Sequence, residues 1–239
     1  MVTFVAELLG TMTLIVLGLG VVANVILSKS KGQNGGWIVI TAGWAIAVMS
    51  GLFVSTALGG PSSLNPAIII AGFVTSGANL LDGSFAIAGQ FVGAFLGAVL
   101  VWLIYLPHWA ETEDKNLKLA VFSTGPAIRN PLANLMTETI ATFVLVFIVG
   151  AIFSNAVGMA ARGMTPILVG GLTWGLGLSL GGPTGYALNP ARDLGPRIAH
   201  FVLPISGKGG SDWSYSWVPV VGPIIGAVLA MLFRNSLGL

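Results

Sequence analysis

The sequence contains no cysteine, few charged residues and only two histidines. Without cysteine the chain can form no disulfide and has no thiolate to hold a metal. His108 and His200 stand apart from each other and from any cluster of acidic residues, which is a poor basis for a metal site. We therefore expect neither a metal nor a cofactor.

Charged residues make up 8% of the chain, whereas they make up about 25% of an ordinary soluble domain. The formal net charge is +2, which is too small to indicate a nucleic-acid partner. The apolar stretches contain no serine–histidine pair and no facing carboxylates, so we do not expect an enzyme.

Hydrophobic residues, in contrast, are abundant. They make up 55% of the 239 residues, and the mean hydropathy is +0.92. The 34 glycines suit close contact between helices in lipid. This composition indicates an integral membrane protein with little of the chain outside the bilayer. The N-terminus has no basic segment or cleavage site, so we expect the first apolar run to be the first span.

Six apolar runs are long enough to cross about 30 Å of hydrocarbon, which takes roughly 20 residues of helix. They cover residues 4–28, 36–58, 84–106, 133–156, 164–181 and 214–234. A β-barrel would show shorter segments of alternating polarity. Two further runs, 66–76 and 190–203, are too short, because eleven helical residues rise only about 16 Å. The pattern predicts an all-α membrane protein with six transmembrane helices and two re-entrant half-helices.

The two halves of the chain resemble each other. Residues 4–26 and 135–157 are similar apolar runs, and each carries one glutamate near its start, Glu7 or Glu138. Each half has three spans, an odd number, so the second half would enter the membrane upside down. We predict one transmembrane channel domain over residues 1–239, built as an inverted repeat with one copy at about 1–106, a linker at about 107–131 and a second copy at about 132–239.

The triplet Asn-Pro-Ala opens both short runs. It comprises Asn65, Pro66 and Ala67 in the first half, and Asn189, Pro190 and Ala191 in the second. Asparagine is a favoured N-cap and proline a favoured first helical residue, so each triplet predicts a helix start. In an inverted repeat the two starts meet near the membrane centre with their positive dipole ends facing each other. We expect each amide oxygen to cap its helix and each amide NH2 group to remain free for a solute.

These features resemble the major intrinsic protein family, the aquaporins and glycerol facilitators. The resemblance covers nearly the whole chain: the six spans, the two half-helices, both glutamates and both triplets. The second triplet lies in GYALNPARDLGPR at 185–197, which is similar to the glycerol-conducting branch because Asp193 follows Arg192. The resemblance implies the aquaporin fold and a passive channel.

The family narrows its pore at an aromatic and arginine filter. The resemblance places Trp44, Gly177, Tyr186 and Arg192 at its four positions. Water channels usually carry histidine where Gly177 stands, so glycine leaves more room, although a slip of one residue would put Leu178 there. Arginine donors beside aromatic rings suit a small polyol. The loop Pro61-Ser62-Ser63 departs from the glycine and histidine of many members.

Three acidic residues complete the predicted site. The resemblance implies that Glu7 and Glu138 accept hydrogen bonds that hold the half-helix loops, although a carboxylate inside a membrane can also serve as a proton relay. We expect Asp193 to neutralise or orient Arg192. We expect Gln90 to bond across helices.

We expect a passive channel for glycerol and other small neutral solutes, with some water. The filter residues leave open whether water, urea or a protonated hydroxy acid such as lactic acid is the main solute. A secondary transporter, which also uses inverted repeats, is less favoured.

The resemblance also implies a homotetramer in the lipid bilayer, and we expect a bacterial plasma membrane. The family orientation would put Arg162 and Arg234 in the cytoplasm. It would put outside the residues Lys29, Lys31, Lys115, Lys118, Arg129 and Lys208, which runs against the positive-inside rule.

Overall fold

The computed structural model describes residues 1–157 and 163–238, and within them every regular element is an α-helix. The long helices are α1 (Val2–Ile26), α2 (Trp37–Ala57), α4 (Leu80–Ile104), α7 (Pro131–Ile152) and α10 (Val218–Leu237). The shorter helices are α3 (Pro66–Ser76), α5 (His108–Glu111), α6 (Lys115–Phe122), α8 (Thr165–Leu180) and α9 (Pro190–Val202).

Five of the six predicted spans are helices long and apolar enough to cross a membrane. The remaining one, α8, has 16 residues and therefore rises about 24 Å. It begins close to residues 158–162, which lie outside the described part of the chain. The two half-helices are confirmed as α3 and α9, and the polar linker contains α5 and α6.

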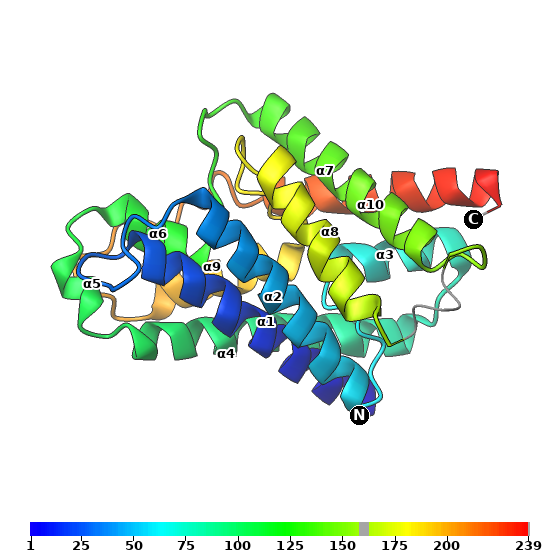
Figure 1. The fold of residues 1–239 in the computed structure, drawn as a ribbon, viewed down its shortest axis with the longest axis horizontal. Coiled ribbons are helices and arrows are strands. Elements are labelled where there is room, and N and C mark those ends of the chain that lie inside the picture. The colour runs from blue at the N-terminus through cyan, green and yellow to red at the C-terminus, as the bar shows by residue number, and fades with distance from the viewer. Residues whose placement is uncertain (158–162, 239) are drawn as a thin grey trace.

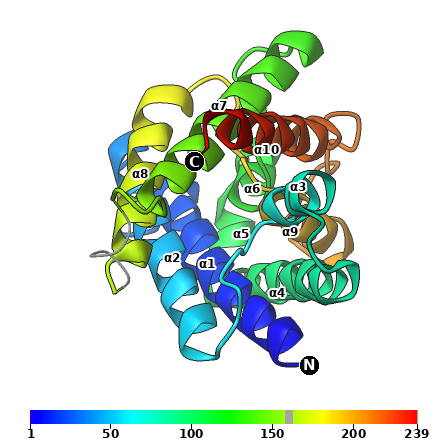
Figure 2. The same cartoon turned by 90° about the vertical axis from the view of Figure 1, so that its right-hand side faces the viewer.

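The internal repeat is visible in how the helices pack. Helix α1 packs against α2 and α4, and α7 packs in the same way against α8 and α10. The half-helices cross over: α9 lies against α4, and α3 lies against α10 (Figure 2). Each half-helix is thus packed against the last helix of the other half, so the two halves interlock.

Glycine lets the helices of each half approach closely. A Cβ at Gly89 would lie 2.4 Å from the Phe4 carbonyl oxygen, and one at Gly93 would lie 2.2 Å from that of Leu8. In the second half, a Cβ at Gly226 would lie 2.3 Å from the Thr139 carbonyl oxygen. Such contacts leave no room for a side chain, which is typical of small residues between membrane helices.

The outer faces of the long helices are apolar. Ile46, Leu103, Ile140 and Leu232 are each about half exposed on them. Helices satisfy their own backbone hydrogen bonds, so such a surface is suited to hydrocarbon. The chain is a multi-pass membrane protein.

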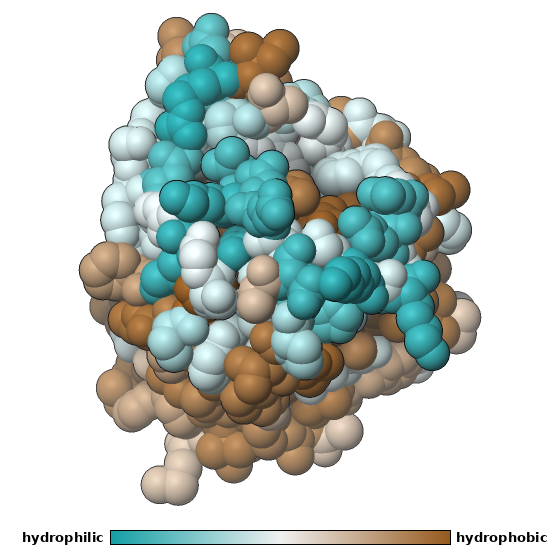
Figure 3. Space-filling view, turned by 90° about the vertical axis from the view of Figure 1, so that its left-hand side faces the viewer, coloured by the Kyte–Doolittle hydropathy of each residue, from teal (hydrophilic) through white to brown (hydrophobic). Residues whose placement is uncertain are grey.

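The charged residues gather mainly at one end of the molecule. Figure 3 looks onto the end that holds α5 and α6 and shows hydrophilic residues gathered there beside a hydrophobic surface. At this end Lys29 pairs with Glu111, and Arg129 pairs with Asp212. Both chain termini lie toward the other end (Figure 1). Arg162, which the predicted orientation also places there, is outside the described residues.

We predict that Gly93→Ala destabilises the protein by about 1–3 kcal/mol, the usual cost of overpacking, because the new methyl group would meet the Leu8 carbonyl. Gly175→Ala in α8 is the control, since a Cβ there meets nothing within 4 Å. It should be neutral or slightly stabilising. The measurement is the temperature at which the purified protein in detergent stops being monodisperse. An equal loss in both variants would contradict this account.

Candidate functional site

Both half-helices begin as the Asn-Pro-Ala triplets predict. Asn65 has extended backbone, and its Oδ1 accepts a hydrogen bond from the Ala67 N–H at 2.9 Å. Asn189 Oδ1 accepts from the N–H groups of Ala191 and Arg192 at 3.0 and 3.2 Å. A proline follows each asparagine at a position where a helix needs no N–H donor.

The amide NH2 groups are not fully free, contrary to the prediction. Asn65 Nδ2 donates to the Leu188 carbonyl at 2.8 Å, and Asn189 Nδ2 donates to the Leu64 carbonyl at 2.6 Å. Each asparagine therefore binds the carbonyl directly before the other one. An amide NH2 has two N–H groups, and both side chains line a cavity. One donor on each asparagine is left for a solute.

The loops that lead into the two helices have unusual backbone. Ser62 and Leu64 have φ of 55° and 49°, and Tyr186 and Leu188 have φ of 39° and 55°. In each loop, these residues lie three positions and one position before the capping asparagine. Positive φ at a residue other than glycine costs roughly 1–3 kcal/mol and persists only where the surroundings enforce it. Other contacts must therefore hold both loops.

Glu7 and Glu138 supply these contacts, and both are fully buried. Glu7 accepts hydrogen bonds from the backbone N–H groups of the two residues before Asn65, at 3.1 and 2.8 Å. Glu138 does the same for the two residues before Asn189, at 3.0 and 2.9 Å. Further donors are the side chains of Ser55, Gln90 and Thr184. The geometry matches the predicted anchoring role, and the bond from Gln90 is confirmed.

A cavity of about 500 Å³ lies between the two halves. Its wall on α2 is formed by one helical face, which carries Trp44, Val48, Leu52 and Thr56. These positions span a rise of about 18 Å along the helix. Both strained loops and both capping asparagines line the same cavity. The predicted polar path and the cavity therefore coincide.

Trp44, Tyr186 and Arg192 line the cavity together. The Arg192 guanidinium lies over the Trp44 ring, with Cζ 4.1 Å from the ring centroid, which is a cation–π contact. In the described part of the chain, the side chain makes one hydrogen bond, a long one of 3.5 Å from Nη1 to the Phe122 carbonyl. A guanidinium has five N–H donors, so most of them are available to a bound molecule.

Gly177 lies behind Tyr186, and the described cavity lining does not include it. A Cβ at Gly177 would lie 2.7 Å from Tyr186 Cζ and 2.9 Å from Thr41 Cγ2. Leu178, the alternative at this position, is 49% exposed and is not among the residues that line the cavity. Gly177 therefore makes room indirectly, because it lets the Tyr186 ring sit back from the cavity.

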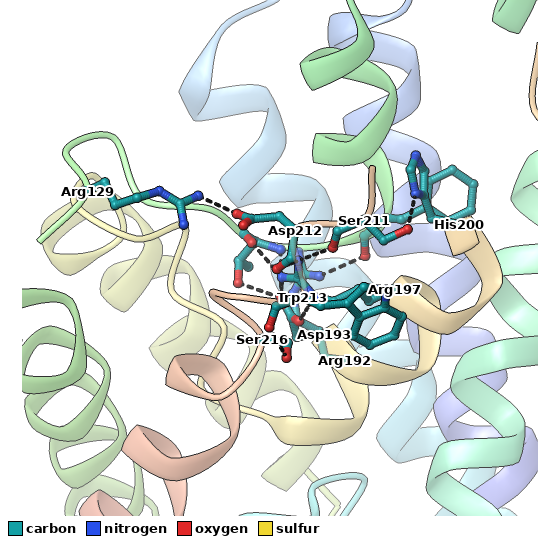
Figure 4. A network of polar contacts seen from close by, with 11 residues as sticks. Arg129, Arg192, Asp193, Arg197, His200, Ser211, Asp212, Trp213 and Ser216 are labelled. Carbon is teal, nitrogen blue, oxygen red and sulfur yellow. Dashed lines mark hydrogen bonds and ion pairs between the residues drawn. The ribbon is translucent and has the colours of Figure 1, made fainter. Parts of the chain in front are cut away.

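Asp193 was predicted to neutralise or orient Arg192, but its direct ion pair is with Arg197. Its Oδ1 accepts from Arg197 Nε at 2.8 Å, and its Oδ2 accepts from Arg197 Nη2 at 3.1 Å (Figure 4). Residues four apart share one face of a helix, whereas Arg192 projects to the cavity. Arg197 was not predicted, although the Asp-x-x-x-Arg spacing was a readable signal.

Outside the membrane-spanning segments, Arg129 and Asp212 form a partly exposed ion pair. Burial raises the pKa of the Asp212 carboxyl, but the hydrogen bonds from Arg129 and Ser214 outweigh it, and the pKa lies below its ordinary value. This pair therefore stays charged at neutral pH. Among the described residues, no group of histidines and carboxylates could hold a metal ion.

Comparisons with known proteins identify the family of this chain. The profile of the family described as "Major intrinsic protein" matches residues 1–233. The "Probable glycerol uptake facilitator protein" of Thermotoga maritima is 54% identical to this chain, over 99% of this chain and 100% of that one. The "Glycerol uptake facilitator protein" of Bacillus subtilis is 48% identical, over 99% of this chain and 85% of that one.

The fold is also similar to a solved structure, the X-ray structure of the aquaglyceroporin from Plasmodium falciparum. The TM-score is 0.86 at 28% identity, and the match covers 98% of this chain and 95% of that one. The family match and the bacterial relatives span almost the whole chain. This chain belongs to the major intrinsic protein family.

Proposed function

We propose that this protein is a passive channel that conducts glycerol and other small neutral solutes, with some water, through the cavity between its two halves. The observation that carries the proposal is the corner formed by Arg192 and Trp44, where the guanidinium stands 4.1 Å above the ring. Glycerol has hydroxyl groups along one edge and carbon along the other. The unused arginine donors fit its hydroxyls, and the aromatic walls fit its carbon edge.

The two capping asparagines continue the pathway from this corner. Each keeps one N–H donor toward the cavity, beyond the one that binds across the halves. The positive ends of α3 and α9 meet there, and Arg192 adds a full charge, so cations are opposed. Neutral solutes pass down their own gradient, and the proposal includes no catalytic step and no energy coupling.

The remaining roles follow from the contacts of each residue. Glu7 and Glu138 anchor the two loops, and Gly177 seats Tyr186 at the filter. We propose that residues 1–106 and 132–239 act as two copies of an inverted repeat, joined by a linker at 107–131, in one channel domain. The apolar outer faces support a place in a lipid bilayer, and the bacterial relatives support a bacterial plasma membrane. We propose a homotetramer, as the resemblance to the family implies.

We predict that proteoliposomes containing the protein take up glycerol faster than empty liposomes, with a low activation energy and no dependence on ion gradients. The measurement is stopped-flow light scattering with a panel of water, glycerol, urea and lactic acid, the last across a range of pH. Fast water flux without glycerol flux would refute the glycerol assignment. Saturating flux that depends on an ion gradient would favour a secondary transporter.

We predict that Gly177→His lowers glycerol flux relative to water flux by roughly tenfold, which corresponds to about 1.4 kcal/mol of barrier. The reason is that a Cβ at this position would already lie 2.7 Å from Tyr186 Cζ, so any side chain drives the ring toward the cavity. Gly177→Ala should have the same effect to a smaller degree.

The control for this experiment is Leu178→Ala, because Leu178 is the neighbouring residue and is exposed on the outside of α8. It should leave the ratio of glycerol to water flux unchanged. If Gly177→His lowered both fluxes equally, Gly177 would have no part in selecting the solute.

A further inference from the structure

Arg197 is a fully buried arginine that ties α9 to two separate loops. Its Nε and Nη2 bind Asp193, and Nη2 also donates to the Thr124 carbonyl at 2.9 Å. Its Nη1 donates to the carbonyls of Ser211 and Asp212 at 2.8 and 3.2 Å (Figure 4). A guanidinium has five N–H groups, and this one has a partner for each.

Asp193 also binds the loop that contains Thr124. Its Oδ2 accepts hydrogen bonds from the Thr124 N–H at 2.8 Å and from Thr124 Oγ1 at 2.7 Å. A buried ion pair adds little net stability, because desolvation offsets the attraction, but it can fix one geometry. Thr124 is thus fixed by both members of the pair, through its N–H, its carbonyl and its hydroxyl group.

The fixed segment reaches the filter by two routes. Phe122, two residues before Thr124, provides the carbonyl that accepts from Arg192 Nη1 at 3.5 Å. On the other side, the Ala127 N–H donates to the Pro183 carbonyl at 3.0 Å, in the loop that carries Tyr186. Segment 122–127 therefore stands behind both the arginine and the aromatic residue at this end of the cavity.

Thr124 also contacts Gly185, the residue directly before Tyr186. A Cβ at Gly185 would lie 3.4 Å from Thr124 Cβ and Cγ2, so the Thr124 side chain lies beside the Gly185 backbone. Phe122 is itself fully buried between the rings of Trp109 and His200, each with its centroid 5.5 Å away. Ring packing at Phe122 and the ion pair at Thr124 therefore both restrain the segment.

We propose that Arg197, Asp193 and Thr124 are positioning residues of the selectivity filter: the ion pair fixes segment 122–124, and this segment fixes Arg192 and Tyr186. The inference rests on the proposed channel function and extends it to residues that do not line the cavity. If the segment is released, the Phe122 carbonyl no longer restrains the Arg192 guanidinium. The filter then becomes wider on average and discriminates less sharply between polyols of different size.

The test measures two permeabilities in proteoliposomes, one for glycerol and one for ribitol, a five-carbon sugar alcohol. Arg197→Lys should lower the ratio of glycerol to ribitol permeability by about three- to tenfold, the range that corresponds to losing one or two hydrogen bonds. Thr124→Val keeps the ion pair and the backbone bonds and removes only the hydroxyl donor. It should lower the ratio by about twofold.

Arg129→Gln is the matched control. It breaks the partly exposed ion pair with Asp212, on the same loop that Arg197 binds, but Arg129 does not contact Asp193 or segment 122–124 through that pair. Its ratio should equal that of the unmodified protein. A general loosening of this end of the molecule would lower the ratio in all three variants and would overturn the proposal.

Thr124→Val keeps the proposal testable if Arg197→Lys does not fold, since valine has the shape of threonine. An unchanged or increased ratio in Thr124→Val would then overturn it. The outcome for the unmodified protein separates the two hypotheses. If that protein conducts no glycerol, the proposed function fails; if it conducts glycerol and both variants keep its ratio, only the positioning role fails.

Discussion

The structure depends on two hydrogen bonds that cross between its halves. Asn65 donates to the Leu188 carbonyl and Asn189 donates to the Leu64 carbonyl, while the oxygen of each amide caps its own helix. Each bond ends on the carbonyl directly before the other asparagine. Each helix start is therefore bonded directly to the loop of the other half. Both asparagines line the cavity, together with Arg192 and Trp44, the two residues proposed to bind glycerol. The proposed barrier to cations lies at the same pair of helix starts.

The two loops that carry these carbonyls have strained backbone, which other contacts must hold in place. Positive φ at Leu64 and Leu188 is enforced by the buried glutamates, which bind the N–H groups of both loops. The glutamates in turn need close helix packing: a Cβ at Gly222 would lie 2.7 Å from Glu138 Cβ. Glycines allow the helices to pack closely, and this packing buries the glutamates. The buried glutamates then hold the loops that line the cavity.

Much of the fold could be predicted because its signals are local. Composition and run length gave the spans, and Asn-Pro-Ala located the starts of α3 and α9, since capping involves only neighbouring residues. The errors concern contacts between distant segments. The amide NH2 groups of Asn65 and Asn189 are partly used because each binds a carbonyl in the loop of the other half. Gly177 sits behind Tyr186 because α8 and the second loop meet there. The Gly177–Tyr186 contact cannot be found without the path of the loop, whereas the four-residue spacing of Asp193 and Arg197 could have been read from the sequence.

The most direct test of the central claim is a structure of the protein determined with glycerol. The account predicts glycerol bound between Arg192, Trp44 and Tyr186, with its hydroxyl groups on the guanidinium and its carbon edge against the rings. These three residues already line one cavity, with the guanidinium and the Trp44 ring in contact. Glycerol bound with its hydroxyls away from Arg192, or absent from this corner while occupying another part of the cavity, would contradict it.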